Sequence, residues 1–272
     1  QIIRLFNAPA FAQSMAAAGN EKALRDFEWN AIARAYGELF SQEIGARKKV
    51  VIATGLFPPD IGGPATYVHL LTETLPAYGV AMRVAAFRHV RKFPKILRHA
   101  IYFWKVATMA RGGDIIFAQD PVSTGLPALC AARLMGKKFL LKIVGDYAWE
   151  QYQQMQNAKC KNQEYNTKIK TLEEFQQGRY DIKTEVRRFI ERHVARGADR
   201  VIVPSEYLKK IIMQWGVPEA RIQVIYNAFP RPLSHASKES ARAVCGMSPQ
   251  TFEIVSVGRL VPWKGFDALI SA

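Results

Sequence analysis

Several residue types and patterns are scarce in this sequence of 272 residues. Its three cysteines, Cys130, Cys160 and Cys245, are widely spaced, which excludes a disulfide framework and a zinc site and favours a reducing compartment. Its five histidines lack metal-ligand spacing and no Asp-x-Asp pair occurs, so we expect neither a metal nor another cofactor. No apolar run has the length of a membrane span and no signal peptide is visible, so we expect a cytoplasmic protein.

The motifs of several common protein classes are also missing. The sequence has no Gly-x-Gly-x-x-Gly dinucleotide motif, no P-loop and no Gly-x-Ser-x-Gly nucleophile motif. Ser205, which follows a predicted strand, is therefore interpreted as a helix N-cap. No recognised nucleic-acid-binding module is present, so we expect no specific nucleic-acid partner.

Acidic residues are absent between Met82 and Gly113, in a chain whose formal net charge is +15. Apolar residues such as Phe93 and Trp104 are interleaved with the basic ones. This pattern is typical of a helix on an anionic membrane surface, which would place the protein on the inner face of the membrane. The alternative is a helix with one face in the core and a basic face in water. The basic residues are Arg83, Arg88, Arg91, Lys92, Lys95, Arg98, Lys105 and Arg111.

Short apolar runs alternate with amphipathic segments from Lys49 onward, which predicts an α/β fold with a doubly wound parallel sheet. Ligands of such sheets bind at the carboxyl ends of the strands. The predicted strands are Val50–Ala53, Arg83–Phe87, Ile115–Gln119, Lys138–Val144, Arg200–Val203 and Gln223–Tyr226. The predicted helices lie near Ala65–Ala77, Ile96–Ala110, Thr124–Met135, Thr184–Ala195 and Glu206–Trp215.

The chain divides into four predicted segments. Residues 1–46 are helical in pattern, residues 47–230 form the sheet domain, and residues 231–250 are a polar linker that contains prolines. Residues 251–272 open a second domain with a buried strand at Phe252–Val257 and a helix. Because the chain begins at Gln1 and stops inside an apparent helix, we expect a fragment. A polar excursion, Tyr147–Tyr180, is expected to lie over the site.

Two glycine-containing loops are candidate anion sites. Gly62 and Gly63 precede a helix whose N-terminus, with its free N–H groups, suits phosphate; the alternative is a loop without a ligand. Arg259 and Lys264 lie in a loop between a predicted buried strand and a helix. Such a pair of cations can clamp a diphosphate, because arginine supplies a planar fork and lysine a point charge.

Polar residues after the predicted strands are candidates for the remaining chemistry. Asp146 can orient or deprotonate a hydroxyl group. Asp120 is equally well placed, but an aspartate before a helix commonly caps it. Trp149 and Glu150 are expected to line the pocket of Asp146, with a buried Trp149 as the alternative. Asn227 either turns the chain towards the linker or touches the site.

Four stretches together resemble glycosyltransferase family 4, the retaining, sugar-nucleotide-dependent transferases of GT-B fold. They are residues 58–63 (PPDIGG), 203–208 (VPSEYL), 224–228 (VIYNA) and 257–266 (VGRLVPWKGF). The last is close to the donor-phosphate signature that opens the C-terminal domain of the family. The resemblance implies that the sheet is Rossmann-like and is the N-terminal, acceptor-binding half of a GT-B fold.

The resemblance also implies an activity and roles for four residues. The expected reaction transfers a sugar, with retention, from a nucleotide-diphosphate sugar to a cell-surface glycan or a lipid-linked acceptor. Arg259 and Lys264 would hold the diphosphate and stabilise the leaving group. Gly62 and Gly63 would approach the donor phosphate.

The chain departs from the family pattern in two places. Many relatives have a histidine after the third strand, where this chain has Gln119 and Asp120, so the acceptor-side catalytic group stays open among these two residues and Asp146. The C-terminal pair of glutamates of the family is absent, so we expect an incomplete donor site and a chain that is nearly inactive alone. The alternative is a non-catalytic fragment that binds a membrane or a partner.

The first forty residues are similar to the extreme C-terminus of the same family, where the closing helices return to the N-terminal domain. This similarity rests on Met15–Phe40 and implies a tandem fusion, a permuted order or a genomic fragment. It predicts that Gln1–Phe40 packs as helices on the sheet domain.

Overall fold

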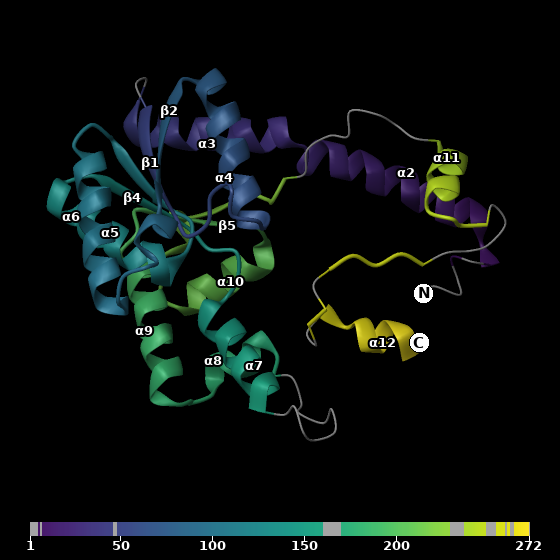
Figure 1. Cartoon of the computed structure of the whole chain (residues 1–272). Helices are drawn as coiled ribbons and strands as arrows, with labels where there is room; N and C mark the ends of the chain where they lie inside the picture. Colours follow the sequence, from purple (N-terminus) through teal and green to yellow (C-terminus); the bar gives the residue numbers. More distant parts are fainter. Residues whose placement is uncertain are drawn as a thin grey trace.

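The computed structural model describes residue 5 and residues 7–45, 48–159, 170–228, 237–248, 254–258, 260–261 and 264–271. Its centre is a six-stranded parallel sheet in the order β2-β1-β3-β4-β5-β6 (Figure 1). The predicted Rossmann-like, doubly wound sheet with an N-terminal helical segment is confirmed, and each predicted strand overlaps an observed one. The strands are β1 (Lys48–Thr54), β2 (Val80–Ala86), β3 (Ile115–Ala118), β4 (Lys138–Lys142), β5 (Arg200–Val203) and β6 (Ile222–Val224).

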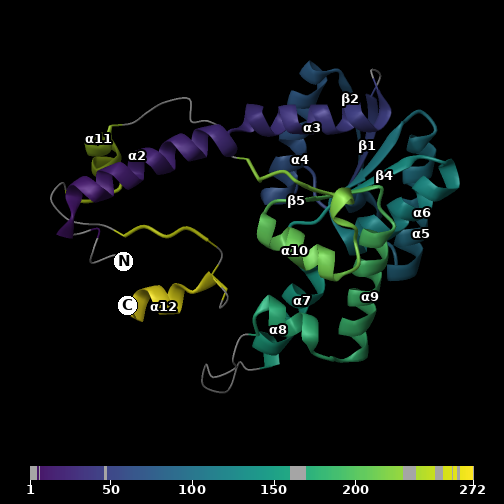
Figure 2. The same cartoon turned by 180° about the vertical axis from the view of Figure 1, so that it is seen from behind.

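Helices cover both faces of the sheet, as Figures 1 and 2 show from opposite sides. Alternate side chains of each strand enter opposite layers: Val51 packs with residues of α5, α6, α9 and α10, and Val50 packs with residues of α3 and α4. The central strand β3 is therefore apolar and buried along its whole length, whereas the edge strands β2 and β6 also carry exposed residues. The helices are α2 (Pro9–Asp26), α3 (Trp29–Ile44), α4 (Gly63–Thr74), α5 (Lys95–Ala110), α6 (Leu126–Met135), α7 (Tyr147–Lys159), α8 (Leu172–Gln177), α9 (Ile182–Arg196), α10 (Glu206–Gln214), α11 (Lys238–Val244) and α12 (Phe266–Ser271).

Helix α3 joins the N-terminal segment to the sheet. The side chains of Tyr36 and Phe40 are fully buried in the layer that α3 shares with β1, β3 and α4. At the end of the helix, Glu43 accepts hydrogen bonds from Arg200 Nε at 2.7 Å and from Lys138 Nζ at 3.3 Å, which links α3 to β5 and β4. The predicted packing of the N-terminal helices is therefore found for α3.

Helix α2 does not follow that prediction. None of its residues is buried, and both views show it extending away from the sheet, beside α11. Its large apolar side chains are Phe11, Met15 and Leu24, which are too few to form an apolar stripe along a helix of this length. The expectation that all of residues 1–40 pack on the sheet is therefore wrong for α2.

The C-terminal segment also differs from the prediction. Residues 254–258 form no strand, and Ile254, Val255 and Val257 are exposed, so the buried strand predicted at Phe252–Val257 is wrong for its described residues. A strand is buried only where neighbouring strands and helices cover it. Residues 254–258 pair with no strand of the sheet, and α11 and α12 contain no buried residue.

Candidate functional site

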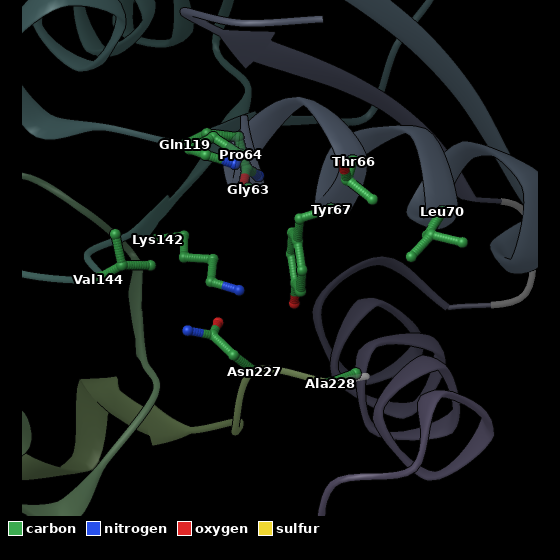
Figure 3. Close-up of a pocket in the computed structure, with 10 residues that line it drawn as sticks. All are labelled: Gly63, Pro64, Thr66, Tyr67, Leu70, Gln119, Lys142, Val144, Asn227 and Ala228. Atoms are coloured by element: carbon green, nitrogen blue, oxygen red, sulfur yellow. The ribbon is translucent and has the colours of Figure 1, made fainter. Parts of the chain in front are cut away.

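A pocket of about 430 Å³ lies at the carboxyl edge of the sheet (Figure 3). The chain places β2 on one side of β1 and β3 on the other, which creates at this edge the switch point where doubly wound sheets bind ligands. The pocket falls within the range of about 300–1,000 Å³ that is typical of small-ligand sites. Its lining comes from the start of α4, the ends of β3 and β4, and the chain after β6: Gly63, Pro64, Thr66, Tyr67, Leu70, Gln119, Lys142, Val144, Asn227 and Ala228.

The N-terminus of α4 forms one wall of this pocket. Gly62 precedes the helix with a φ of 145°, a conformation that residues with a side chain rarely adopt. Gly63 lines the pocket, and a methyl group added to it would meet nothing within 4 Å. Ligand atoms can therefore approach the backbone at the positive end of the helix. The role of both glycines in binding donor phosphate stays a prediction.

Lys142 is a buried cation in this pocket. It ends β4, is 1% exposed, and directs its amine towards Tyr67 and Asn227 (Figure 3). Its Nζ lies 3.3 Å from the centroid of the Tyr67 ring and 5.8 Å from that of Tyr36. Among the residues that the structure describes, Nζ has no hydrogen-bond partner. Burial therefore lowers the pKa of this amine well below its usual 10.5.

Gln119 and Asn227 are sequence-predicted residues that the structure brings together with Lys142. Gln119 follows β3, and its Nε2 is buried without a hydrogen-bond partner within the described part of the chain. Asn227 follows β6, and its amide faces Lys142 across the pocket (Figure 3). The lining residues include no carboxylate. This set of nitrogen donors suits a ligand rich in oxygen atoms or negative charge.

Asp120 caps a helical turn and is not a lining residue. Its Oδ1 accepts hydrogen bonds from the N–H groups of Val122, Ser123 and Thr124 at 2.6 to 3.1 Å. Its Oδ2 accepts a further one from the Thr124 hydroxyl group at 2.6 Å. The geometry supports the capping alternative, and a catalytic role for Asp120 stays a prediction.

Asp146, Trp149 and Glu150 are also absent from the pocket lining. Asp146 accepts hydrogen bonds from the Trp149 N–H at 2.7 Å and from Gln176 Nε2 at 2.8 Å, so its carboxylate joins the start of α7 to α8. Burial raises the pKa of Asp146. The Trp149 indole donates to the Lys170 carbonyl group at 3.0 Å. The polar excursion thus forms α7 and α8, which contribute no lining residue, and residues 160–169 lie outside the described residues.

Of the two predicted donor-phosphate cations, the structure describes only Lys264, which is not a lining residue of this pocket. Lys264 is exposed, and Arg259 lies outside the described residues, so their roles stay predictions.

Within the described ranges, no group of three or more His, Cys, Asp and Glu side chains is arranged to hold a metal ion. In the same residues, no helix combines the length and the apolarity that crossing a bilayer requires.

Sequence reasoning did not identify Lys142 or Tyr67. The signal for Lys142 is its position in the apolar run of β4, where it shares a sheet face with the buried Leu140. A lysine on the buried face of a central strand is unusual and indicates a special role. Tyr67 carries no comparable signal, since a tyrosine on the inner face of α4 is ordinary in a core.

Comparisons with known proteins agree with this fold. A sequence model of Glycosyltransferase Family 4 matches residues 61–230, more than half of the chain. No curated protein sequence matches the chain. Among solved structures, Anabaena HepE in complex with UDP is similar at a TM-score of 0.51 and 17% identity, over 82% of this chain and 56% of that one. HepE with UDP-glucose gives the same values. The UDP-GlcNAc 2-epimerase of Methanocaldococcus jannaschii has a TM-score of 0.44 at 12% identity, over 66% of this chain and 45% of that one.

The likeness to HepE shows the fold alone, and this chain spans a little over half the length of that protein. The family match is more specific. It extends from the glycine loop before α4 to just beyond β6 and so contains every residue that lines the pocket. The chain therefore belongs to glycosyltransferase family 4.

Proposed function

We propose that this chain is the acceptor-binding half of a glycosyltransferase that moves a sugar, with retention, from a nucleotide-diphosphate sugar to a glycan or a lipid-linked acceptor. The observation that carries the proposal is the pocket in which the open N-terminus of α4 meets the ends of β3 and β4. Family membership supports the reaction class. The complexes of HepE with UDP and UDP-glucose support a nucleotide sugar as the donor.

The proposed reaction separates charge. As the nucleotide diphosphate departs, the sugar becomes positive and the diphosphate becomes negative, so preorganised cations accelerate the step. Arg259 and Lys264 would supply these cations. The N–H groups near Gly63 would face the donor phosphate, and the acceptor would enter the same pocket beside Gln119.

We also propose that this chain transfers sugar slowly by itself. Lys264 is exposed and α12 buries no residue, so the described part of the loop that carries the cations has no rigid support. A clamp that is held loosely loses stabilisation of the transition state, because the cations must be ordered during the reaction.

A second observation favours contact with an anionic membrane near a lipid-linked acceptor. On α5, Ile96 and Trp104 are 88% and 59% exposed, and Leu97 is exposed beside them. They lie in the stretch that has no acidic residue. Apolar side chains flanked by cations are what an interfacial helix presents to anionic lipid.

The reaction class is tested by supplying the chain with a panel of nucleotide-diphosphate sugars and oligosaccharide acceptors. The product is quantified, and NMR of its new anomeric centre decides retention. Arg259→Ala and Lys264→Ala should each lower the slow turnover of this chain further, whereas Lys210→Ala, which removes an exposed cation from α10, should not. Equal turnover in all variants would refute the assigned clamp. No product with any donor would refute the proposed reaction.

A further inference from the structure

Lys142 occupies a position where the fold has no need of a charge. Its neighbour on the same face of β4, Leu140, is fully buried in the layer formed with α3 and α4. An unbranched apolar side chain would fill the same space without burying an amine. Because a buried amine without a hydrogen-bond partner is costly, the molecule is less stable for having Lys142 than it would be with such a side chain.

The groups around the amine offset this cost only in part. The face of the Tyr67 ring lies 3.3 Å from Nζ and attracts a cation. Burial raises the pKa of Tyr67 and of Tyr36, the two titratable side chains that face the amine from α4 and α3, so both remain uncharged. The pocket lining contains no aspartate or glutamate. Within the described residues, the amine therefore has no counter-charge.

A second donor that lines the pocket is also unpaired. Gln119 Nε2 is buried in the same pocket without a hydrogen-bond partner among the described residues. The Asn227 amide faces the same space (Figure 3). Unpaired donors of buried groups mark the place of acceptor atoms that the protein itself does not supply.

We propose that this pocket binds an anionic group of the acceptor, a carboxylate or a phosphate, with Lys142 as its counter-charge and the amides of Gln119 and Asn227 as further donors. This inference deepens the proposed function and rests on it, because it names the chemistry of the acceptor. A carboxylate or phosphate has lone pairs for several donors, and a hydrogen bond between two charged groups is stronger than one between neutral groups.

Proton uptake follows from this arrangement. In the empty pocket burial favours the neutral amine, as its lowered pKa indicates. An anion in contact with Nζ favours the ammonium form instead. Binding of an anion therefore raises the pKa of Lys142, whereas a neutral sugar in the same space leaves it low.

The experiment observes Lys142 directly. The chain is labelled with ¹³C,¹⁵N-lysine, and the Cε and Nζ resonances are followed by NMR as the pH is changed, with Lys142→Met identifying the signal. The probes are sodium glucuronate, inorganic phosphate and, as a neutral control, glucose. We expect glucuronate or phosphate to raise the titration midpoint of Lys142 and glucose to leave it unchanged.

Affinity measurements provide the second readout. Lys142→Met should weaken binding of the preferred anion at least tenfold while the melting temperature does not fall. Lys49→Met, the same change at an exposed lysine of β1 at the opposite edge of the sheet, should bind as the original chain does. Stronger binding of glucuronate would indicate a carboxylated acceptor. Stronger binding of phosphate would indicate a phosphorylated acceptor if UDP does not displace the phosphate; displacement by UDP would assign the phosphate to the donor and overturn its assignment to the acceptor.

The inference is overturned if neither anion moves the Lys142 titration, or if Lys142→Met binds both anions with the original affinity. These measurements use no donor sugar. An anion effect in a chain that transfers no sugar would refute the proposed reaction and leave the anion site standing. Sugar transfer without any anion effect would refute the anion site alone.

Discussion

The hydroxyl group of Tyr67 donates a hydrogen bond of 3.0 Å to that of Tyr36, and this contact connects the helix after the glycine loop with the N-terminal segment. Tyr36 is fully buried, and its ring centroid lies 5.7 Å from that of Phe117 in β3. The Lys142 amine lies over the Tyr67 ring, 3.3 Å from its centroid. Helix α3 therefore supports the wall of the pocket and is part of the site's structure.

We expect α3 and α2 to contribute very differently to stability. Phe40→Ala removes a fully buried ring from the α3 layer and should destabilise the fold by about 3–5 kcal/mol. Met15→Ala is the matched control on α2, where the side chain is exposed, and should change the free energy of unfolding by about 0.5 kcal/mol or less. Denaturant unfolding of both variants measures the difference. An equal loss of unfolding free energy in the two variants would contradict the packing described for α2.

Glu43 should make stability depend on pH in the acidic range. Burial raises the pKa of this carboxyl group, but hydrogen bonds from Arg200 and Lys138 outweigh it and leave the pKa below its usual 4.5. The stabilisation is therefore present above that value and is lost as the pH falls through the pKa of the folded state. We expect Glu43→Gln to cost about 1 kcal/mol at pH 7, since both partners are partly exposed, and to cost less in acid. A cost that does not change with pH would refute this account.

Lys142→Met should stabilise the empty chain. The unfolded state keeps the lysine proton up to a pH near 10.5, whereas burial makes the folded state release it at lower pH. Rising pH therefore favours folding of the original chain, and the advantage of the variant should shrink as the pH approaches 10.5. At pH 7 we expect a gain of about 1–3 kcal/mol from removing the unpaired amine. Melting curves of both chains between pH 6 and about 10 test the trend.

Gly63→Ala should separate ligand binding from folding. A methyl group at this position meets nothing within 4 Å and requires no unusual backbone angle, so the melting temperature should not fall. The methyl group would nevertheless stand in front of the first turn of α4 and should lower turnover at least tenfold. Gly19→Ala, at a helical glycine of α2 with equally open surroundings, is the control. Unchanged turnover in Gly63→Ala would show that no ligand approaches this backbone closely.

Membrane contact through α5 is tested with the double variant Ile96→Ser/Trp104→Ser. Loss of two exposed apolar side chains should weaken binding to phosphatidylserine vesicles at least tenfold, since each contributes roughly 1.5–3 kcal/mol when buried. The control Ile182→Ser/Val186→Ser removes two exposed apolar side chains from α9 instead. Equal vesicle binding by the two double variants would refute contact through α5.

Local patterns predicted most of the fold and only part of the site. The strand Arg200–Val203 was predicted at its observed bounds, because a short apolar run bounded by polar residues is itself the pattern of a buried strand. Ser205 caps α10 through a hydrogen bond of 3.1 Å from the Leu208 N–H, as its place before a helix indicates. Phe252–Val257 has a similar pattern, but no partner covers its described residues, and burial depends on partners that a local pattern does not contain.

Local sequence patterns were sufficient to predict the alternation of strands and helices, the open glycine before α4 and the family, since each depends on residues close together in the chain. The meeting of Tyr36, Tyr67 and Lys142 depends instead on how distant segments pack together. They come from α3, α4 and β4, and they are brought together by the order of the strands in the sheet and by the packing of α3 across it. Their chemistry depends on burial, which lowers the pKa of a lysine only after distant segments have excluded water from around it.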